Sequence, residues 1–188
     1  MNRRLFGLFL LVLSWPSLAG AFGLDQLMRG LAAHPGGTVR FVETRHVAIL
    51  DAPIVSTGEM TYTPPDRLEK RTLKPRPERL LLEQDTLTLE RDQRRMSLRL
   101  SSRPEVMAFV DSIRDMLGGH QAALERNYLM QPQGTQQQWV LVLYPKDHEI
   151  AALVQRITVN GREGQVRSIE YLQADGDRTV IEIEPLKP

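Results

Sequence analysis

The stretch PEVMAFVDSIRDML, residues 104–117, decides how the rest of the chain is interpreted. Its apolar residues recur at steps of three and four, so they share one face of a helix. They are Val106, Phe109, Val110, Ile113, Met116 and Leu117. The opposite face, which we expect to meet solvent, carries Glu105, Asp111, Ser112, Arg114 and Asp115. The stretch therefore predicts one amphipathic helix that covers an apolar surface.

Strand-like segments precede and follow this helix, and a short helix near residues 24–31 comes before them. Residues 67–74 are charged on both faces and run into Pro75, which indicates an edge strand or a highly exposed one. Met96, Leu98 and Leu100 alternate with polar residues, as in a half-buried strand. Residues 139–144 are apolar on both faces, which is typical of a central strand. Short connections predict a mainly β fold with an α lid: a strongly curved antiparallel sheet of about 11 strands, forming an incomplete barrel.

The first residues resemble a secretory signal peptide. Arg3 and Arg4 precede an apolar run over 5–15, and a small-residue cleavage pattern follows at 19–21. We therefore expect residues 1–21 to be removed and residues 22–188 to form a single domain in the periplasm. The chain has no cysteine, so it can form no disulfide and carries no lipid on a cysteine.

The overall charge gives no support for nucleic-acid binding, because 24 basic residues stand against 23 acidic ones. One local surplus of positive charge lies between residues 67 and 79. It consists of Arg67, Lys70, Arg71, Lys74, Arg76 and Arg79. Two interpretations stay open: a solvated strand face, or a surface that contacts anionic headgroups of a membrane.

Motifs for catalysis are weak, and we expect the protein not to be an enzyme and to need no metal or cofactor. The four histidines lack the spacing of metal ligands. No serine lies in a Gly-x-Ser-x-Gly motif. Asp175 and Asp177 flank Gly176, which is typical of a hairpin turn and lacks the rest of a calcium loop.

Two motifs support a family resemblance. Residues 58–62, GEMTY, run into PPDRL at 64–68, and Trp139-x-Leu141-x-Leu143-x-Pro145 follows the central helix. In this order they resemble the periplasmic outer-membrane lipoprotein carrier (LolA) family, and the chain looks like a divergent LolA-like member. The resemblance implies an unclosed barrel that holds acyl chains under a helical lid. In that family an arginine before the proline matching Pro65 latches the lid. Pro64 stands there in this chain, and Arg45 or Arg67 are the candidate substitutes.

The leading functional hypothesis is a carrier that binds the acyl chains of a lipoprotein or lipid and moves them toward the outer membrane. It implies an inner-membrane donor and an outer-membrane acceptor. One alternative is a lipid-sensing or partner-binding module that regulates an inner-membrane export system; another is a periplasmic enzyme acting on lipids. The residues expected to line the cavity or lid are Phe41, Met60, Tyr62, Leu68, Leu98, Phe109, Ile113, Met116, Trp139, Leu141 and Ile169.

Overall fold

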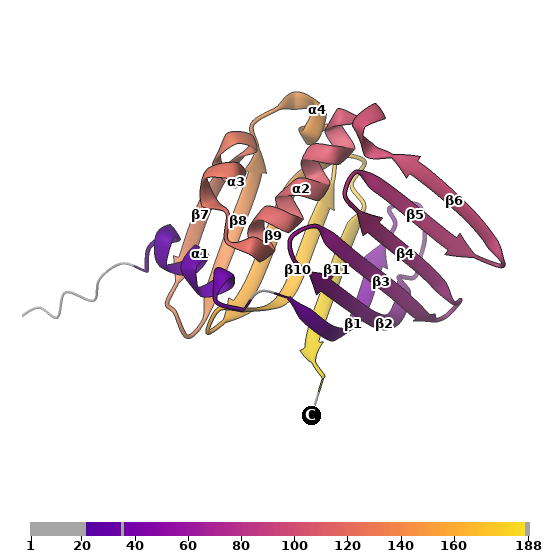
Figure 1. The fold of residues 1–188 in the computed structure, drawn as a ribbon, viewed down its shortest axis with the longest axis horizontal. Helices are drawn as coiled ribbons and strands as arrows, with labels where there is room; N and C mark the ends of the chain where they lie inside the picture. The colour runs from indigo at the N-terminus through magenta and orange to yellow at the C-terminus, as the bar shows by residue number, and fades with distance from the viewer. Residues whose placement is uncertain (1–21, 35, 187–188) are drawn as a thin grey trace, which may run out of the picture.

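A computed structural model describes residues 22–34 and 36–186. All strands belong to one antiparallel sheet, whose arrangement is shown in Figure 1. The strands are β1 (Gly37–His46), β2 (Ile54–Thr63), β3 (Arg67–Lys74), β4 (Glu78–Glu83), β5 (Thr86–Arg91), β6 (Arg94–Arg99), β7 (Tyr128–Gly134), β8 (Trp139–Pro145), β9 (Val154–Arg162), β10 (Gln165–Gln173) and β11 (Arg178–Pro185). The helices are α1 (Leu24–Ala32), the 3-10 turn η1 (Leu100–Ser102), α2 (Pro104–Gly118), α3 (Gln121–Asn127) and α4 (His148–Ala151). The expected signal peptide at 1–21 lies outside the described residues.

The order of strands in the sheet is β6-β5-β4-β3-β2-β1-β11-β10-β9-β8-β7. Most neighbouring strands are joined by turns or loops, and helix α4 connects β8 to β9. Strands β1 and β11 pair in the middle of the sheet. The outermost strands β6 and β7 do not pair with each other, and η1, α2 and α3 carry the chain from one to the other. The prediction of a curved, unclosed antiparallel sheet covered by helices is confirmed.

Helix α2 lies across one face of the sheet, which we call the inner face (Figure 1). Pro104 occupies its first turn, where a missing N–H costs nothing. Gly119 ends it with φ 71°, the left-handed conformation that favours glycine at this position. A side chain at Gly119 would place a Cβ 2.5 Å from the carbonyl oxygen of Met28 in α1. Glycine therefore also permits the close contact between α1 and the end of α2.

Two apolar clusters hold the helix on the sheet. The larger cluster joins Met116 of α2 to α1, α3 and the inner faces of β8–β10, with Trp139, Leu141 and Val159 at its centre. The smaller cluster joins Val110 to Leu82 of β4 and to Leu100 of η1. The two ends of the helix are therefore anchored to different parts of the sheet.

Two strand predictions were wrong in their placement. β3 is not an edge strand but lies between β2 and β4. Its charges are tolerated inside the sheet because opposite charges on neighbouring strands pair with them, as Arg79 of β4 does with Glu69. β6, expected to be half buried, is exposed along its whole length. It is an outermost strand, and α2 packs on β4 and β5 rather than on it.

The polar face of α2 also differs from the expectation, because Ser112 and Arg114 are buried. The Ser112 hydroxyl donates to the Phe109 carbonyl within the helix. The guanidinium of Arg114 donates to the carbonyl oxygen of Gln84, in the turn between β4 and β5, and to Asp111 at 3.1 Å. The helix is thus enclosed on more of its circumference than a simple apolar stripe predicts.

Candidate ligand-binding site

A cavity of about 1010 Å³ lies between α2 and the inner face of the sheet. This volume is at the upper end of the range of small-molecule sites, about 300–1,000 Å³. Val106, Phe109, Val110, Ile113 and Leu117 of α2 form its roof. Its wall comes chiefly from β1–β5 and β9–β11, so it reaches across the β1–β11 pair at the centre of the sheet.

Strand register explains why the wall is mainly apolar. Side chains directly opposite one another on paired strands share a face of the sheet. One row of paired residues crosses Tyr62, Leu68, Leu82 and Leu87, and all four line the cavity. A second row crosses Ile169 and Ile181 in the other half of the sheet. Alternation along each strand therefore directs the large apolar side chains into the cavity.

Six residues that sequence reasoning nominated line this cavity together. They are Met60, Tyr62, Leu68, Phe109, Ile113 and Ile169. The aromatic ring of Phe109 contacts that of Tyr171 edge-on, with centroids 5.5 Å apart, and so joins the roof to the wall. The Tyr62 hydroxyl donates to the Pro65 carbonyl at 3.1 Å, which holds its ring against the turn after β2.

The other five nominated residues do not line the cavity, although Met116 belongs to the lid helix α2. Met116, Trp139 and Leu141 are packed into the larger apolar cluster, where α1 and α2 fill the space above the sheet. Phe41 is buried beneath the ammonium group of Lys70. Leu98 lies on β6, one strand beyond its lining partner Leu87, and is 42% exposed. Apolar alternation predicts which face of a strand is inward. It does not predict which strands are covered by the packed apolar cluster and which border the cavity.

The polar residues of the wall that sequence reasoning missed include Glu43, Lys70 and Tyr171. Glu43 and Lys70 form an ion pair across β2. Burial, and to a smaller extent the negative charge of Glu43, raise the pKa of the Tyr171 phenol. The sequence did contain a signal, because residues two apart on a strand share a face of the sheet. Lys70 lies two residues from Leu68, and Glu43 lies two residues from Phe41. Lys70 was instead placed in the basic cluster, whose two interpretations were left open, and Glu43 was not considered as a site residue.

The two suggested replacements for the latch arginine, Arg45 and Arg67, pair with residues outside the lid helix. Arg45 pairs with Asp177 at 3.1 Å, and Arg67 pairs with Glu69 and Glu83, so these pairs engage the sheet and its turns. Arg114 joins the helix to the sheet instead, through the Gln84 carbonyl. The arginine that connects roof and wall therefore lies on α2 itself.

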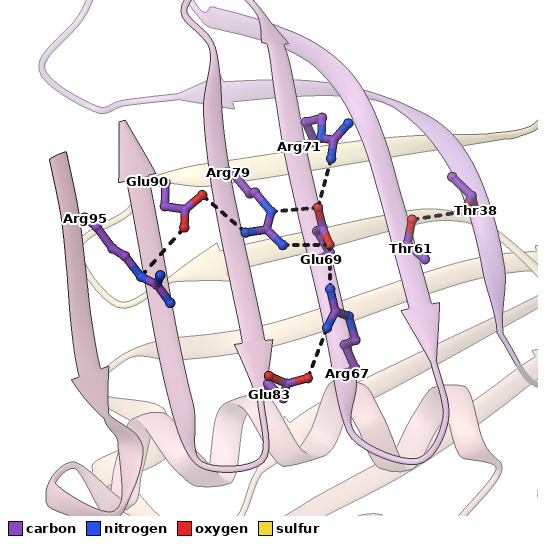
Figure 2. Close-up of polar contacts among 9 residues, drawn as sticks. All are labelled: Thr38, Thr61, Arg67, Glu69, Arg71, Arg79, Glu83, Glu90 and Arg95. Carbon is purple, nitrogen blue, oxygen red and sulfur yellow. Dashed lines mark hydrogen bonds and ion pairs between the residues drawn. The ribbon is translucent and has the colours of Figure 1, made fainter. Parts of the chain in front are cut away.

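The basic cluster of the sequence divides between the two faces of the sheet. On the outer face, Glu69 accepts hydrogen bonds from Arg79 at 2.8 Å and from Arg67 at 3.1 Å, and Arg79 also reaches Glu90 at 3.2 Å (Figure 2). The hydrogen bonds from Arg79 and Arg67 lower the pKa of Glu69 to about 2. This ladder of alternating charges favours a solvated strand face over a membrane contact for Arg67 and Arg79.

Other kinds of site receive no support from the part of the chain that the structure describes. Across residues 22–34 and 36–186, no group of three His, Cys, Asp or Glu side chains is placed to hold a metal ion. Within the same ranges, no helix has the length and apolar character needed to cross a bilayer.

The fold is a half-barrel of antiparallel strands with a helical lid over an apolar cavity. Residues 17–182 match the model of the LolA-like outer-membrane lipoprotein carrier proteins, and the chain belongs to this family. The sequence matches none of the curated proteins.

Several solved structures are similar to the chain. A LolA superfamily protein from Nitrosomonas europaea has 11% identity and a TM-score of 0.44, over 89% of this chain and 95% of that one. The lipoprotein LppX of Mycobacterium tuberculosis has 9% identity and a TM-score of 0.47, over 86% and 93%. The MucA/MucB complex of Pseudomonas aeruginosa has 11% identity and a TM-score of 0.46, over 85% of this chain and 55% of that one.

Proposed function

We propose that this protein is a periplasmic carrier that binds the acyl chains of a lipoprotein or lipid in the cavity under α2 and delivers them toward the outer membrane. It acts without chemical conversion of its cargo. The observation that carries the proposal is the cavity itself: about 1010 Å³ bounded by apolar side chains of the sheet and of one helix. Membership of the LolA-like family agrees with it.

The energy of burial is sufficient for such a cargo. Each methylene removed from water contributes about 0.8 kcal/mol, so a sixteen-carbon chain contributes on the order of 12 kcal/mol before the costs of association. A cavity can therefore hold an acyl chain through its apolar wall alone. The same energy opposes release into water, so delivery requires transfer to another apolar site.

This energetic argument implies partners on both sides. A donor at the inner membrane and an acceptor at the outer membrane would each offer an apolar site to the chain. Separation of α2 from the β4–β5 turn, where Arg114 contacts the Gln84 carbonyl, is the movement that would open the cavity between them.

Uptake of a fluorescent fatty acid by the purified protein tests the proposal, together with mass spectrometry of lipids extracted from it. The variant Leu80→Trp fills the cavity wall and should abolish uptake. Its control is Leu73→Trp, which adds the same ring at an exposed site on the neighbouring strand β3. Transfer of the probe from loaded protein to acceptor vesicles then tests carriage.

Absence of bound acyl species and of uptake in the wild-type protein would refute the proposal. Equal uptake by the two tryptophan variants would place binding outside the cavity.

A further inference from the structure

One ion pair interrupts the apolar wall of the cavity. The ammonium group of Lys70, on β3, contacts the carboxylate of Glu43, on β1, and both residues line the cavity. Their side chains are only 26% and 17% exposed. Their neighbours in the wall include Met60, paired directly with Lys70, and Ile181, paired directly with Glu43.

The pair depends on a gap left by Gly58. Strand β2 lies between β1 and β3, and Gly58 stands opposite Phe41, so no side chain of β2 covers the Phe41 ring. The Lys70 ammonium lies 5.0 Å from the centre of that ring and reaches Glu43 beyond it. A Cβ at Gly58 would lie 2.9 Å from the ring and 2.0 Å from the Arg71 carbonyl oxygen. The absence of a side chain at Gly58 therefore leaves room for Lys70 to reach Glu43 across the Phe41 ring.

Both members of the pair retain hydrogen-bonding capacity toward the cavity. An ammonium group has three donors, and a carboxylate has about four acceptor positions. Glu43 uses one position for the Ser56 hydroxyl at 3.3 Å. The remaining donors and acceptors are available to a ligand that enters the cavity.

A partly buried ion pair of this kind is weak evidence for a stabilising role. Replacing a buried ion pair by apolar side chains of similar volume is often neutral or stabilising, because two charges lose their hydration. Here Met60 and Leu80 lie directly opposite Lys70. Ile181 lies directly opposite Glu43, so the pair has apolar cross-strand neighbours. A polar pair in the cavity wall is therefore a candidate contact for what the cavity holds.

We propose that Lys70 and Glu43 form a binding site for the uncharged ester or amide linkage that joins an acyl chain to its headgroup. Lys70 donates to the carbonyl oxygen, while Glu43 accepts from an adjacent hydroxyl or N–H group. A charged group fits less well, because an anion would meet Glu43 and a cation would meet Lys70 at the same place. The inference rests on the proposed carrier function and adds the chemistry of the cargo.

The test compares two ligands on the double variant Glu43→Gln/Lys70→Met, which removes both charges and so leaves neither unpaired. The ligands are 1-monopalmitoylglycerol, which has an ester, and the hydrocarbon dye diphenylhexatriene, which has no polar group. We expect affinity for the monoacylglycerol to fall about tenfold, while dye affinity stays within about twofold of the wild type. The matched control is Glu170→Gln/Arg178→Met, which removes an ion pair between β10 and β11 whose two residues do not line the cavity.

A second comparison needs no variant. The wild-type protein should bind 1-monopalmitoylglycerol about tenfold more tightly than 1-hexadecylglycerol, its ether analogue without the carbonyl group. Equal affinity for the ester and the ether would overturn the inference while leaving the carrier function intact. An equal loss of affinity for the monoacylglycerol and the dye in Glu43→Gln/Lys70→Met would do the same. A wild-type protein that binds neither the dye nor the glycerides would refute both proposals.

Discussion

The two halves of the sheet share one helix but present it with different surfaces. On β8 and β9, the inner face is filled: Trp139, Leu141 and Val159 pack against α1 and the end of α2. On β2–β4, the inner face borders the cavity, and Lys70 lies among apolar side chains there. The difference arises because α1 and α3 add apolar side chains to the filled half, through residues such as Leu27 and Leu124.

The two halves of the sheet therefore have different roles. The filled half supplies the burial that stabilises the fold, since packed apolar side chains contribute most to folding free energy. The cavity half can then leave its apolar surface free for a ligand. The two halves should therefore respond differently to substitution.

The largest effect is expected in the filled half, from Trp139→Ala. Trp139 is fully buried and packs directly on Gly161, where a Cβ would lie 2.0 Å from its ring. The variant should lower the free energy of unfolding by about 3–5 kcal/mol. Leu80→Ala, in the cavity wall, should cost clearly less, because its site already borders a cavity. Chemical denaturation of both variants measures the difference, and equal losses would contradict the division.

The next effect concerns the contact between helix and sheet. Arg114→Met removes the hydrogen bond to the Gln84 carbonyl and should lower the free energy of unfolding by about 1–3 kcal/mol. Hydrogen exchange in α2 should accelerate more than in β8–β10. Arg103→Met, at an exposed arginine just before the same helix, should leave exchange in α2 nearly unchanged. Uniform acceleration across the protein would argue against a local opening of the lid.

A smaller, pH-dependent effect is expected on the outer face of the cavity half. The pKa of Glu69 is lowered to about 2 from its ordinary 4.5, first by the hydrogen bond from Arg79 and then by that from Arg67. Because the folded-state pKa is depressed, this stabilisation is present above about pH 4.5 and is lost as the pH falls toward 2.

Glu69→Gln should therefore cost on the order of 1 kcal/mol at pH 7 and almost nothing near pH 2. Denaturant titrations of wild type and variant at several pH values give the difference. If the free energies of unfolding of the two proteins differed by the same amount at all pH values, the lowered pKa of Glu69 would be refuted.

The smallest effect is expected on β6, the outermost strand of the cavity half. Met96 is 63% exposed, so Met96→Ser should change the free energy of unfolding by less than about 0.5 kcal/mol. Leu100→Ser, just beyond the strand, removes a fully buried side chain and should cost several times more. Similar losses in the two variants would show that β6 is covered in solution.

The sequence predicted the fold well where periodicity alone decides the outcome. The apolar stripe of residues 104–117 and the alternation in the strands give the helix, the sheet and the inner face. Periodicity does not report which neighbour lies beside a strand, so β3 was wrongly taken for an edge. Its charges are compatible with an interior position only because residues distant in sequence, such as Glu43, pair with them.

The site was harder to predict than the fold, for a related reason. Trp139 and Met60 both face the inside, and only the position of α1 decides that one is packed and the other borders the cavity. Arg114 was expected in solvent because it lies off the apolar stripe of its helix. The β4–β5 turn, which buries it, comes from a part of the chain 30 residues earlier. Contacts of this kind are absent from any local pattern.

The unpaired edges β6 and β7 have a mechanical consequence. In a closed barrel, any increase in circumference must break hydrogen bonds between strands. Here β6 and β7 can move apart while all hydrogen bonds between paired strands remain. Only side-chain contacts beneath the connecting helices must break. A change in the width of the cavity therefore requires no partial unfolding of the sheet.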